Sequence, residues 1–167
     1  MKMKLNFGCG NTKKEGMINA DIRPTKATDI IIGKTYLPFN DNSFDYILAD
    51  NVLEHVEDLS ITISEFYRIC KNKAIIEVYV PHFNRPQFEY HRRLCRYNFL
   101  GVHCDYNTTS SYHIYFKCLE RYLTLKDGYR FFEKIVNKKI GFYENSFLKS
   151  FIPASELFVK LEVKKLN

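Results

Sequence analysis

The chain has 167 residues, of which 46% are hydrophobic and 26% are charged, enough apolar material for one domain with a single core. Its 7 Gly and 5 Pro follow no repeat, which excludes collagen-like and low-complexity chains. No apolar run approaches the roughly 20 residues that cross a membrane, and the start of the chain is too polar for a signal peptide. We therefore expect a cytoplasmic protein. Its net charge of +6 admits anionic partners without identifying one.

The first fifty residues contain four short apolar runs that predict strands. Residues 1–7 alternate apolar and polar side chains and lead into the turn Gly8-Cys9-Gly10. Residues 17–22, 29–32 and 44–49 are compact apolar runs of the kind that a parallel sheet buries on both faces. The chain therefore begins as an α/β fold.

A helix and a fifth strand follow. Asp58 is placed to cap a helix that ends near Asn72, with a stripe of apolar residues at helical spacing. Residues 74–80 then predict a strand that ends at Pro81. Strand, helix and strand together form a parallel crossover unit. The stripe consists of Leu59, Ile63, Phe66, Tyr67 and Cys70.

The connections after the first two strands, residues 10–17 and 22–29, are too short for a crossover helix and its turns. One face of the sheet should then lack its usual cover, leaving an apolar surface. We expect either the C-terminal half or a second copy of the chain to bury it. This interpretation predicts a two-fold homodimer.

The second half is richer in aromatic residues and less regular. We assign residues 1–81 to a cofactor-binding core, 82–129 to an inserted substrate cover and 130–167 to C-terminal helices and a closing strand, all within a single domain. The cover has a short helix near residues 92–102 and a β-compatible stretch at 114–125. Helices are predicted at 129–136 and 142–152. Residues 156–164 predict an edge or near-edge strand with alternate apolar residues on one side: Leu157, Val159, Leu161 and Val163.

Two features of the first strands point to a ligand. The turn at Gly8, Gly10 and Asn11 lets a ligand approach the backbone closely, although two glycines also occur in ordinary turns. Asp21 ends the second strand, where nucleotide-binding α/β folds present an acid to a ribose diol; by itself it could equally cap a turn. Together the two features favour a nucleotide-like ligand at the carboxyl ends of the strands.

At these positions the sequence resembles the class I S-adenosylmethionine-dependent methyltransferases, especially the compact methyltransferase type 11-like group. The resemblance covers residues 5–83 in order, and the tail at 142–156 also resembles compact members. It implies a Rossmann-like, mostly parallel sheet of seven strands whose last strand is antiparallel. The motifs that carry it are LNFGCGN at 5–11, INADI at 18–22, LPFNDNSFD at 37–45, VLEHV at 52–56, EFYRICK at 65–71 and VPHF at 80–83.

The resemblance also implies roles for individual residues, with S-adenosylmethionine as cofactor. Gly8, Cys9, Gly10 and Asn11 would pass under the methionine part. Asp21 would hold the ribose hydroxyls, with Ile22 beside it. Gly33 and Lys34 would border the adenine, although Lys34 stands where relatives often carry an acid. The amino group would lie near Asp50 and Asn51, with His55 close by.

Two histidines and a basic cluster are candidates for binding the methyl acceptor or for removing its proton. His82, at the end of the fifth strand, and His91 are each placed to act as a general base, or to bind or support structure. Arg92 and Arg93, with aromatic neighbours, suit an anionic group or a stacked base, and suit a solvated basic surface equally. His103 and His113 lack metal spacing, and the five cysteines contain no Cys-x-x-Cys, so no metal site is predicted.

These observations favour methyl transfer to a small-molecule or sugar-like acceptor. A non-catalytic module that keeps the fold and binds a partner is one alternative, and an RNA-directed enzyme is another, although no sequence feature supports a nucleic-acid substrate. A dehydrogenase is a further rival. It is disfavoured because Lys13 occupies the third glycine position of the dinucleotide motif that Gly8 and Gly10 would begin.

Overall fold

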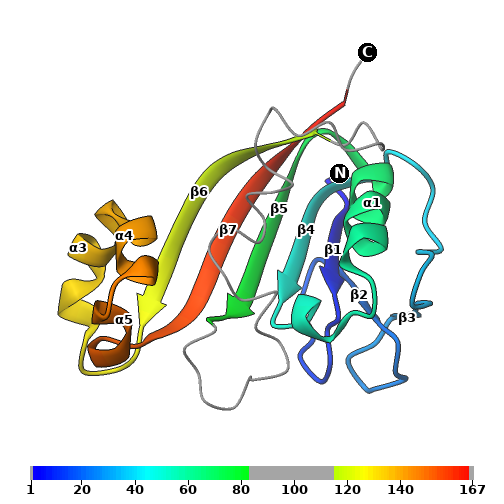
Figure 1. Ribbon diagram of the computed structural model, residues 1–167. Helices are drawn as coiled ribbons and strands as arrows, with labels where there is room; N and C mark the ends of the chain where they lie inside the picture. The colour runs from blue at the N-terminus through cyan, green and yellow to red at the C-terminus, as the bar shows by residue number, and fades with distance from the viewer. Residues whose placement is uncertain (1, 83–114, 166–167) are drawn as a thin grey trace.

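The computed structural model describes residues 2–82 and 115–165, which build one seven-stranded sheet in the order β3-β2-β1-β4-β5-β7-β6 (Figure 1). The first five strands are parallel, whereas β7 is antiparallel to β5 and β6 is antiparallel to β7. This is the expected α/β class, in which the last strand, β7, is the one that runs opposite to the other six. The strands are β1 (Lys4–Phe7), β2 (Ile18–Asp21), β3 (Ile30–Ile31), β4 (Phe44–Asp50), β5 (Cys70–Pro81), β6 (Tyr115–Leu125) and β7 (Ala154–Lys164).

The described helices are short, and none is long and apolar enough to cross a membrane. The crossover helix α1 begins after Asp58, whose side chain accepts a hydrogen bond from the Ile61 amide at 3.0 Å, as the sequence predicted. It ends at Ile69, before the expected end near Asn72, because Cys70 already has extended backbone and pairs with Phe44 as the first residue of β5. The helices are η1 (Leu53–His55), α1 (Leu59–Ile69), η3 (Arg130–Phe132), α3 (Glu133–Lys138), α4 (Ile140–Asn145) and α5 (Leu148–Phe151).

The single helix predicted at residues 142–152 is wrong, because the chain breaks at Ser146 into α4 and α5. Ser146 has an extended backbone, with φ −100° and ψ 166°. Its hydroxyl donates to the carbonyl of Tyr143 at 3.0 Å and accepts from the amide of Leu148 at 3.2 Å. A serine side chain that satisfies backbone groups in this way competes with continuous helix.

The main core lies on the sheet face that α1 covers. Phe66 of α1 meets Phe7 of β1 edge to face, with ring centroids 4.9 Å apart. Strand register places the buried Ile47 and Ile76 on the same face as Leu5. All four alternate residues predicted for the closing strand, from Leu157 to Val163, are buried, which confirms the period-2 interpretation.

The opposite face of the sheet is polar and aromatic, so the prediction of a bare apolar face is wrong. In the middle of this face the Tyr46 hydroxyl donates to Glu77 at 2.7 Å, and Lys160 lies 2.8 Å from the same carboxylate. Burial and the neighbouring Glu77 raise the pKa of Tyr46 above its ordinary value. Phe158 packs between Tyr79 and Tyr122. Because these polar and aromatic side chains bond and pack against one another, this face does not need a second subunit to cover it.

The short connections after β1 and β2 contain no helix, as expected, and buried asparagines hold them in place. Asn6 and Asn19 are paired on the polar face, and the Asn6 amide donates to the Asn19 side-chain oxygen at 2.9 Å. Asn19 also accepts from the backbone amide of Lys14 and donates to the carboxylate of Asp29, both at 2.8 Å. One side chain therefore ties both loops to the sheet.

The second half of the sheet is closed by β6, which pairs along its length with β7. Residues 115–125 of the expected substrate cover are thus a sheet strand, and residues 83–114 lie outside the described residues, including the helix expected at 92–102. The side chain of Asn137 in α3 bonds the backbone N–H and C=O of Leu123, at 2.6 and 2.9 Å. The C-terminal helices are therefore attached at the β6 edge, as Figure 1 shows.

Replacing Asn19 by Ala should lower the free energy of unfolding by about 3 kcal/mol, because it leaves several buried partners unsatisfied at once. Urea denaturation followed by circular dichroism measures this. Asn145→Ala is the control, because its exposed amide bonds only the Gly141 carbonyl of its own helix, and it should cost less than about 0.5 kcal/mol. Equal losses in the two variants would contradict the anchoring role of Asn19.

Candidate functional site

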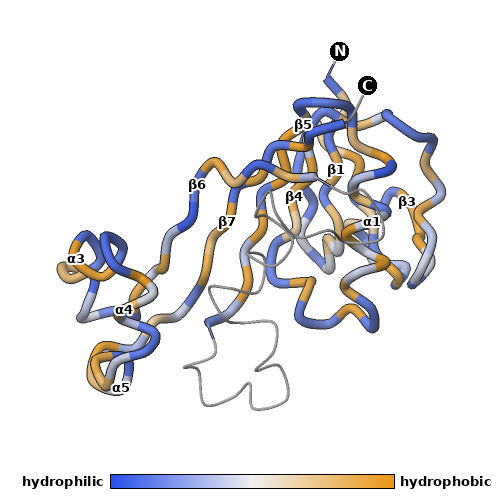
Figure 2. The backbone as a smooth tube through the Cα atoms, turned by 45° about the horizontal axis from the view of Figure 1, so that its top comes forward, coloured by the Kyte–Doolittle hydropathy of each residue, from blue (hydrophilic) through white to orange (hydrophobic). Residues whose placement is uncertain are grey.

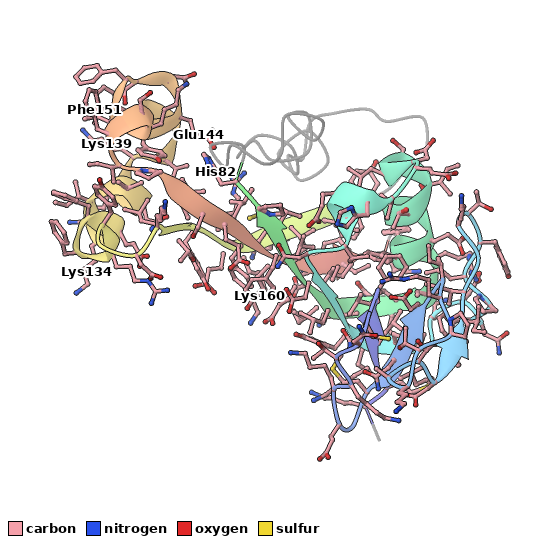
Figure 3. The ribbon with its side chains drawn as sticks, turned by 90° about the horizontal axis from the view of Figure 1, so that it is seen from below. His82, Lys134, Lys139, Glu144, Phe151 and Lys160 are labelled. Atoms are coloured by element: carbon pink, nitrogen blue, oxygen red, sulfur yellow. The ribbon has the colours of Figure 1, made fainter. Side chains whose placement is uncertain are left out.

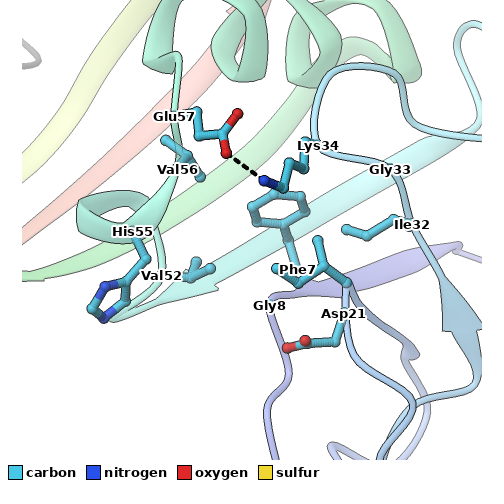
Figure 4. A pocket seen from close by; sticks show the side chains of 11 residues that line it. Phe7, Gly8, Asp21, Ile32, Gly33, Lys34, Val52, His55, Val56 and Glu57 are labelled. Atoms are coloured by element: carbon cyan, nitrogen blue, oxygen red, sulfur yellow. Dashed lines mark hydrogen bonds and ion pairs between the residues drawn. The ribbon is translucent and has the colours of Figure 1, made fainter.

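A pocket opens at the carboxyl ends of β1 and β2, between the segment after β3 and the segment after β4 (Figure 4). In a parallel sheet this edge is where ligands bind. Most of the lining is apolar, with one carboxylate at one end and an ion pair at the other. The lining residues are Phe7, Gly8, Asp21, Ile22, Ile32, Gly33, Lys34, Val52, His55, Val56 and Glu57.

Gly8 shapes the pocket wall where β1 turns into its loop. Its φ of +69° lies in the left-handed region, and a Cβ there would come within 2.1 Å of Val52 Cγ2. The backbone amides of Gly8 and Cys9 both donate to the carbonyl of Ala20, at 2.8 and 3.1 Å. Only glycine allows both the turn and the close approach of the segment after β4. Glycine is therefore required at this position by the backbone turn and by the packing of Val52, and both shape the pocket wall.

Asp21 supplies the buried carboxylate of the pocket. Burial alone raises the pKa of Asp21, but hydrogen bonds from the amides of Arg23 and Gly10, and the charge of Arg23, outweigh it and hold the pKa below its ordinary value. The amides lie 2.9 and 2.8 Å from the two carboxylate oxygens. Each oxygen accepts one of these bonds and retains capacity for another. An ionised carboxylate held in this way suits a ligand with two adjacent hydroxyls.

An ion pair bridges the other end of the pocket. Lys34, after β3, meets Glu57, just before α1, so the two sides of the opening are joined (Figure 4). Both side chains are exposed, and such pairs contribute little to stability. Phe7, Ile32 and Val52 provide apolar surface between this pair and Asp21. The arrangement suits a flat apolar ring joined to a diol.

The pocket brings together six of the eleven residues expected to bind the cofactor. Three others lie in the adjacent glycine loop: Gly10 bonds Asp21, Cys9 is buried, and Asn11 is exposed. Asp50 is the last residue of β4 and Asn51 follows it, and neither lines this pocket. The six residues are Gly8, Asp21, Ile22, Gly33, Lys34 and His55.

Sequence reasoning missed the apolar lining and Glu57. The apolar members are Phe7, Ile32, Val52 and Val56. Phe7 is the last residue of β1, and Val52 follows β4, so their positions at strand ends were the available signal. Apolar residues at strand ends are common in any core, and this signal therefore does not separate a pocket wall from ordinary packing.

Asn51 holds the end of β4 in a turn beside the neighbouring strands. It has a φ of +49°, and its amide N–H donates to the Tyr79 carbonyl at 2.9 Å. Its side chain donates to Asp50 at 2.9 Å and to Glu156 at 3.3 Å. The expected polar pair after the fourth strand therefore lies at the carboxyl edge, on the side of the pocket toward β5 and β7.

His82 lies at the end of β5 on this same edge, with its side chain fully buried. Its Nε2 is 3.3 Å from Glu144 Oε1, and its backbone N–H donates to the Ser155 carbonyl at 3.0 Å (Figure 3). The neighbouring Tyr143 anchors α4 to the start of β7: its hydroxyl donates to the Ile152 carbonyl and accepts from the Ala154 amide. A histidine and a carboxylate from separate elements are thus held together.

The other candidates for acceptor chemistry, His91, Arg92 and Arg93, lie outside the described residues. Within the parts that the structure describes, no group of three or more His, Cys, Asp and Glu side chains is arranged to hold a metal ion.

Residues 5–78 match the family model described as a methyltransferase domain. This match spans the five parallel strands up to Val78 and includes every residue that lines the pocket. Over these residues the chain is therefore similar to a methyltransferase domain, and the matched segment carries the whole pocket described above.

Solved structures share the fold of this chain across its length. A putative sarcosine dimethylglycine methyltransferase from Galdieria sulphuraria is 12% identical, with a TM-score of 0.59 and coverage of 98% of this chain and 78% of that one. Phosphoethanolamine N-methyltransferase 2 from Haemonchus contortus, in complex with S-adenosyl-L-methionine, is 13% identical, with a TM-score of 0.56 and coverage of 99% and 50%. At these identities the likeness establishes the fold.

A curated relative matches a shorter segment of the chain. An uncharacterized protein of Methanocaldococcus jannaschii is 51% identical over 45 residues, which are 27% of this chain and 20% of the relative. The match thus spans about a fifth of that relative's length.

Replacing Asp21 by Asn should weaken binding of S-adenosylhomocysteine by about 10- to 100-fold, because hydrogen bonds to a charged partner contribute about 1.5–3 kcal/mol. Isothermal titration calorimetry measures the affinity. Stability should also fall, since Asp21 holds the amides of Gly10 and Arg23.

Asp45→Asn is the matched control for this experiment. Asp45 accepts hydrogen bonds from the side chain of Lys71 and the backbone amide of Met3, which lower its pKa, but it lies near the start of β4 and does not line the pocket. Its stabilising effect is present at neutral pH and is lost as the pH falls below about 4, so the variant should lose this acid dependence and keep full affinity. Equal loss of affinity in both variants would show that Asp21 acts through the fold alone.

Proposed function

We propose that this chain binds S-adenosylmethionine in the pocket beside Asp21 and catalyses methyl transfer to a small-molecule acceptor whose proton is received by His82. The observation that carries the proposal is the buried, ionised Asp21 at the carboxyl end of β2, with an apolar pocket beside it. Support also comes from the family and from the cofactor complex of the Haemonchus contortus structure.

The donor set fits the cofactor. The carboxylate of Asp21 can accept from two ribose hydroxyls, and Phe7, Ile32 and Val52 offer apolar surface to an adenine ring. Gly8 lets the backbone pass close to the ligand without a side chain in the way. When bound, the cofactor supplies a methyl group on a positively charged sulfur. The protein's task is then to position the acceptor and to remove its proton.

His82 and Glu144 are suited to that proton transfer. A histidine held beside a carboxylate suits a general base, because the carboxylate stabilises the cation that forms when the ring accepts a proton. Both side chains are largely buried, which favours a small acceptor over the surface of a folded macromolecule. This reasoning supports a small, hydroxyl-bearing acceptor, such as a sugar-like compound.

Calorimetry followed by a transfer assay tests the function. The purified protein should bind S-adenosylmethionine and S-adenosylhomocysteine and should not bind NAD measurably. It should then transfer labelled methyl to a small-molecule metabolite fraction and not to RNA. Binding without transfer to any fraction would favour the non-catalytic module, labelling of RNA would favour the RNA-directed enzyme, and equal affinity for NAD would overturn the assignment.

Replacing His82 by Gln should lower kcat by about 100-fold or more without changing cofactor affinity, because general-base catalysis contributes about 10²–10⁴-fold. Gln preserves a donor toward Glu144, which limits the loss of stability.

Glu144→Gln is the second variant and separates catalysis from structure. It should lower kcat about tenfold without changing cofactor affinity, because the cation formed on His82 during proton transfer loses its carboxylate partner. A lower melting temperature with unchanged kcat in both variants would assign the pair a structural role only.

A further inference from the structure

The C-terminal helices expose an unusual concentration of large apolar side chains. Within the described residues, the five most exposed ones all lie between residues 131 and 151, with exposed fractions from 65% to 73%. Single exposed apolar residues are ordinary, but five of them within a short stretch of helices indicate an interaction surface. We call this group the aromatic patch; it consists of Phe131, Ile135, Phe142, Phe147 and Phe151.

Packing of the chain itself explains why these side chains face outward. The helices turn Val136, Ile140 and Tyr143 into the core, so the neighbouring residues lie on the opposite side. Figure 2 shows hydrophobic stretches on α3 and α5, in the part of the molecule farthest from β1. Phe147 and Phe151 meet edge to face at 6.1 Å and still remain mostly exposed. The hydrophobic core is therefore complete without the side chains of the aromatic patch.

The charge around the patch is basic. Lys134, Lys138 and Lys139 are exposed, and none forms an ion pair with another described residue. Figure 3 places Lys134, Lys139 and Phe151 together in the helical group. The nearby acids are engaged elsewhere: Asp127 with Arg130, and Glu133 with the backbone amide of Leu125. Uncompensated lysines thus alternate along the chain with the exposed apolar residues.

This combination favours one class of partner. Protein–protein interfaces are enriched in aromatic residues but depleted in lysine. In a two-fold dimer through this surface, the lysines of the two copies would repel one another. A bilayer of anionic lipids satisfies both features, because aromatic side chains enter the headgroup boundary while lysines meet the lipid phosphates. Contact with the bilayer would require no rearrangement of the rest of the structure.

We propose that the aromatic patch and Lys134, Lys138 and Lys139 form a docking surface for an anionic membrane. The contact is peripheral and reversible, and it is independent of the proposed methyl transfer. It would hold the methyltransferase core beside a bilayer, with the helices α3, α4 and α5 as the attachment point.

Co-sedimentation of the full chain with vesicles tests the proposal. The protein should bind vesicles of equal parts phosphatidylglycerol and phosphatidylcholine, bind pure phosphatidylcholine at least tenfold more weakly, and release as salt is added. The variant Phe147→Ser/Phe151→Ser and the variant Lys134→Glu/Lys139→Glu should each reduce binding at least tenfold. Cofactor affinity should not change in either variant, which also confirms that they fold.

Matched controls carry the same chemical changes elsewhere on the surface. Ile61→Ser/Leu119→Ser removes two exposed apolar residues, and Lys2→Glu/Lys26→Glu reverses two exposed lysines; both should bind vesicles within about twofold to threefold of the unaltered chain. Three results would overturn the proposal: equal binding to both kinds of vesicle, no effect of the patch variants, or sedimentation velocity showing a dimer that the Phe variant dissociates. The last would identify a second copy as the occupant.

Discussion

The hydrogen bond between the buried side chains of Asn6 and Asn19 is the interaction on which the site depends. In a parallel sheet, the connections after neighbouring strands usually contain helices that cover the face where Asn6 and Asn19 lie. In the described residues, the loops after β1 and β2 are too short to form such helices. Asn19 replaces that cover with directed bonds to Lys14 and Asp29, one in each loop. The loops that border the pocket are thereby fixed without an apolar interface.

The position of the acid follows from this anchoring. Asp21 lies two residues beyond Asn19 in β2, so the same strand that holds the loops also sets the carboxylate at the pocket edge. The amide of Gly10 closes the arrangement by bonding Asp21, and Gly8 allows the segment containing Val52 to approach. The ordered loops, the conformation of the glycine turn and the ionised state of Asp21 therefore all depend on this one group of hydrogen bonds. The larger core, where α1 packs on Phe7, supports it from the other face.

The sequence predicted the strands of the sheet well because short apolar runs and period-2 alternation can be recognised from neighbouring residues alone. The four buried residues of β7 from Leu157 to Val163 are an example. Asp21 and Gly8, which the sequence singled out, both line the pocket. The sequence failed on the polar sheet face, because it did not show that Tyr46, Glu77 and Lys160, distant in sequence, are neighbours. The break at Ser146 and the contact of His82 with Glu144 likewise depend on tertiary placement.

The most direct test of the account is a crystal structure of the protein with S-adenosylhomocysteine. The account predicts both ribose hydroxyls within hydrogen-bond distance of Asp21, about 2.5–3.0 Å, and the adenine ring between Ile32 and Val52. The glycine loop at residues 8–10 should keep its conformation, because the site is already assembled. A ribose bound away from Asp21, or a cofactor outside this pocket, would contradict the central claim that the asparagine-anchored loops build the cofactor site.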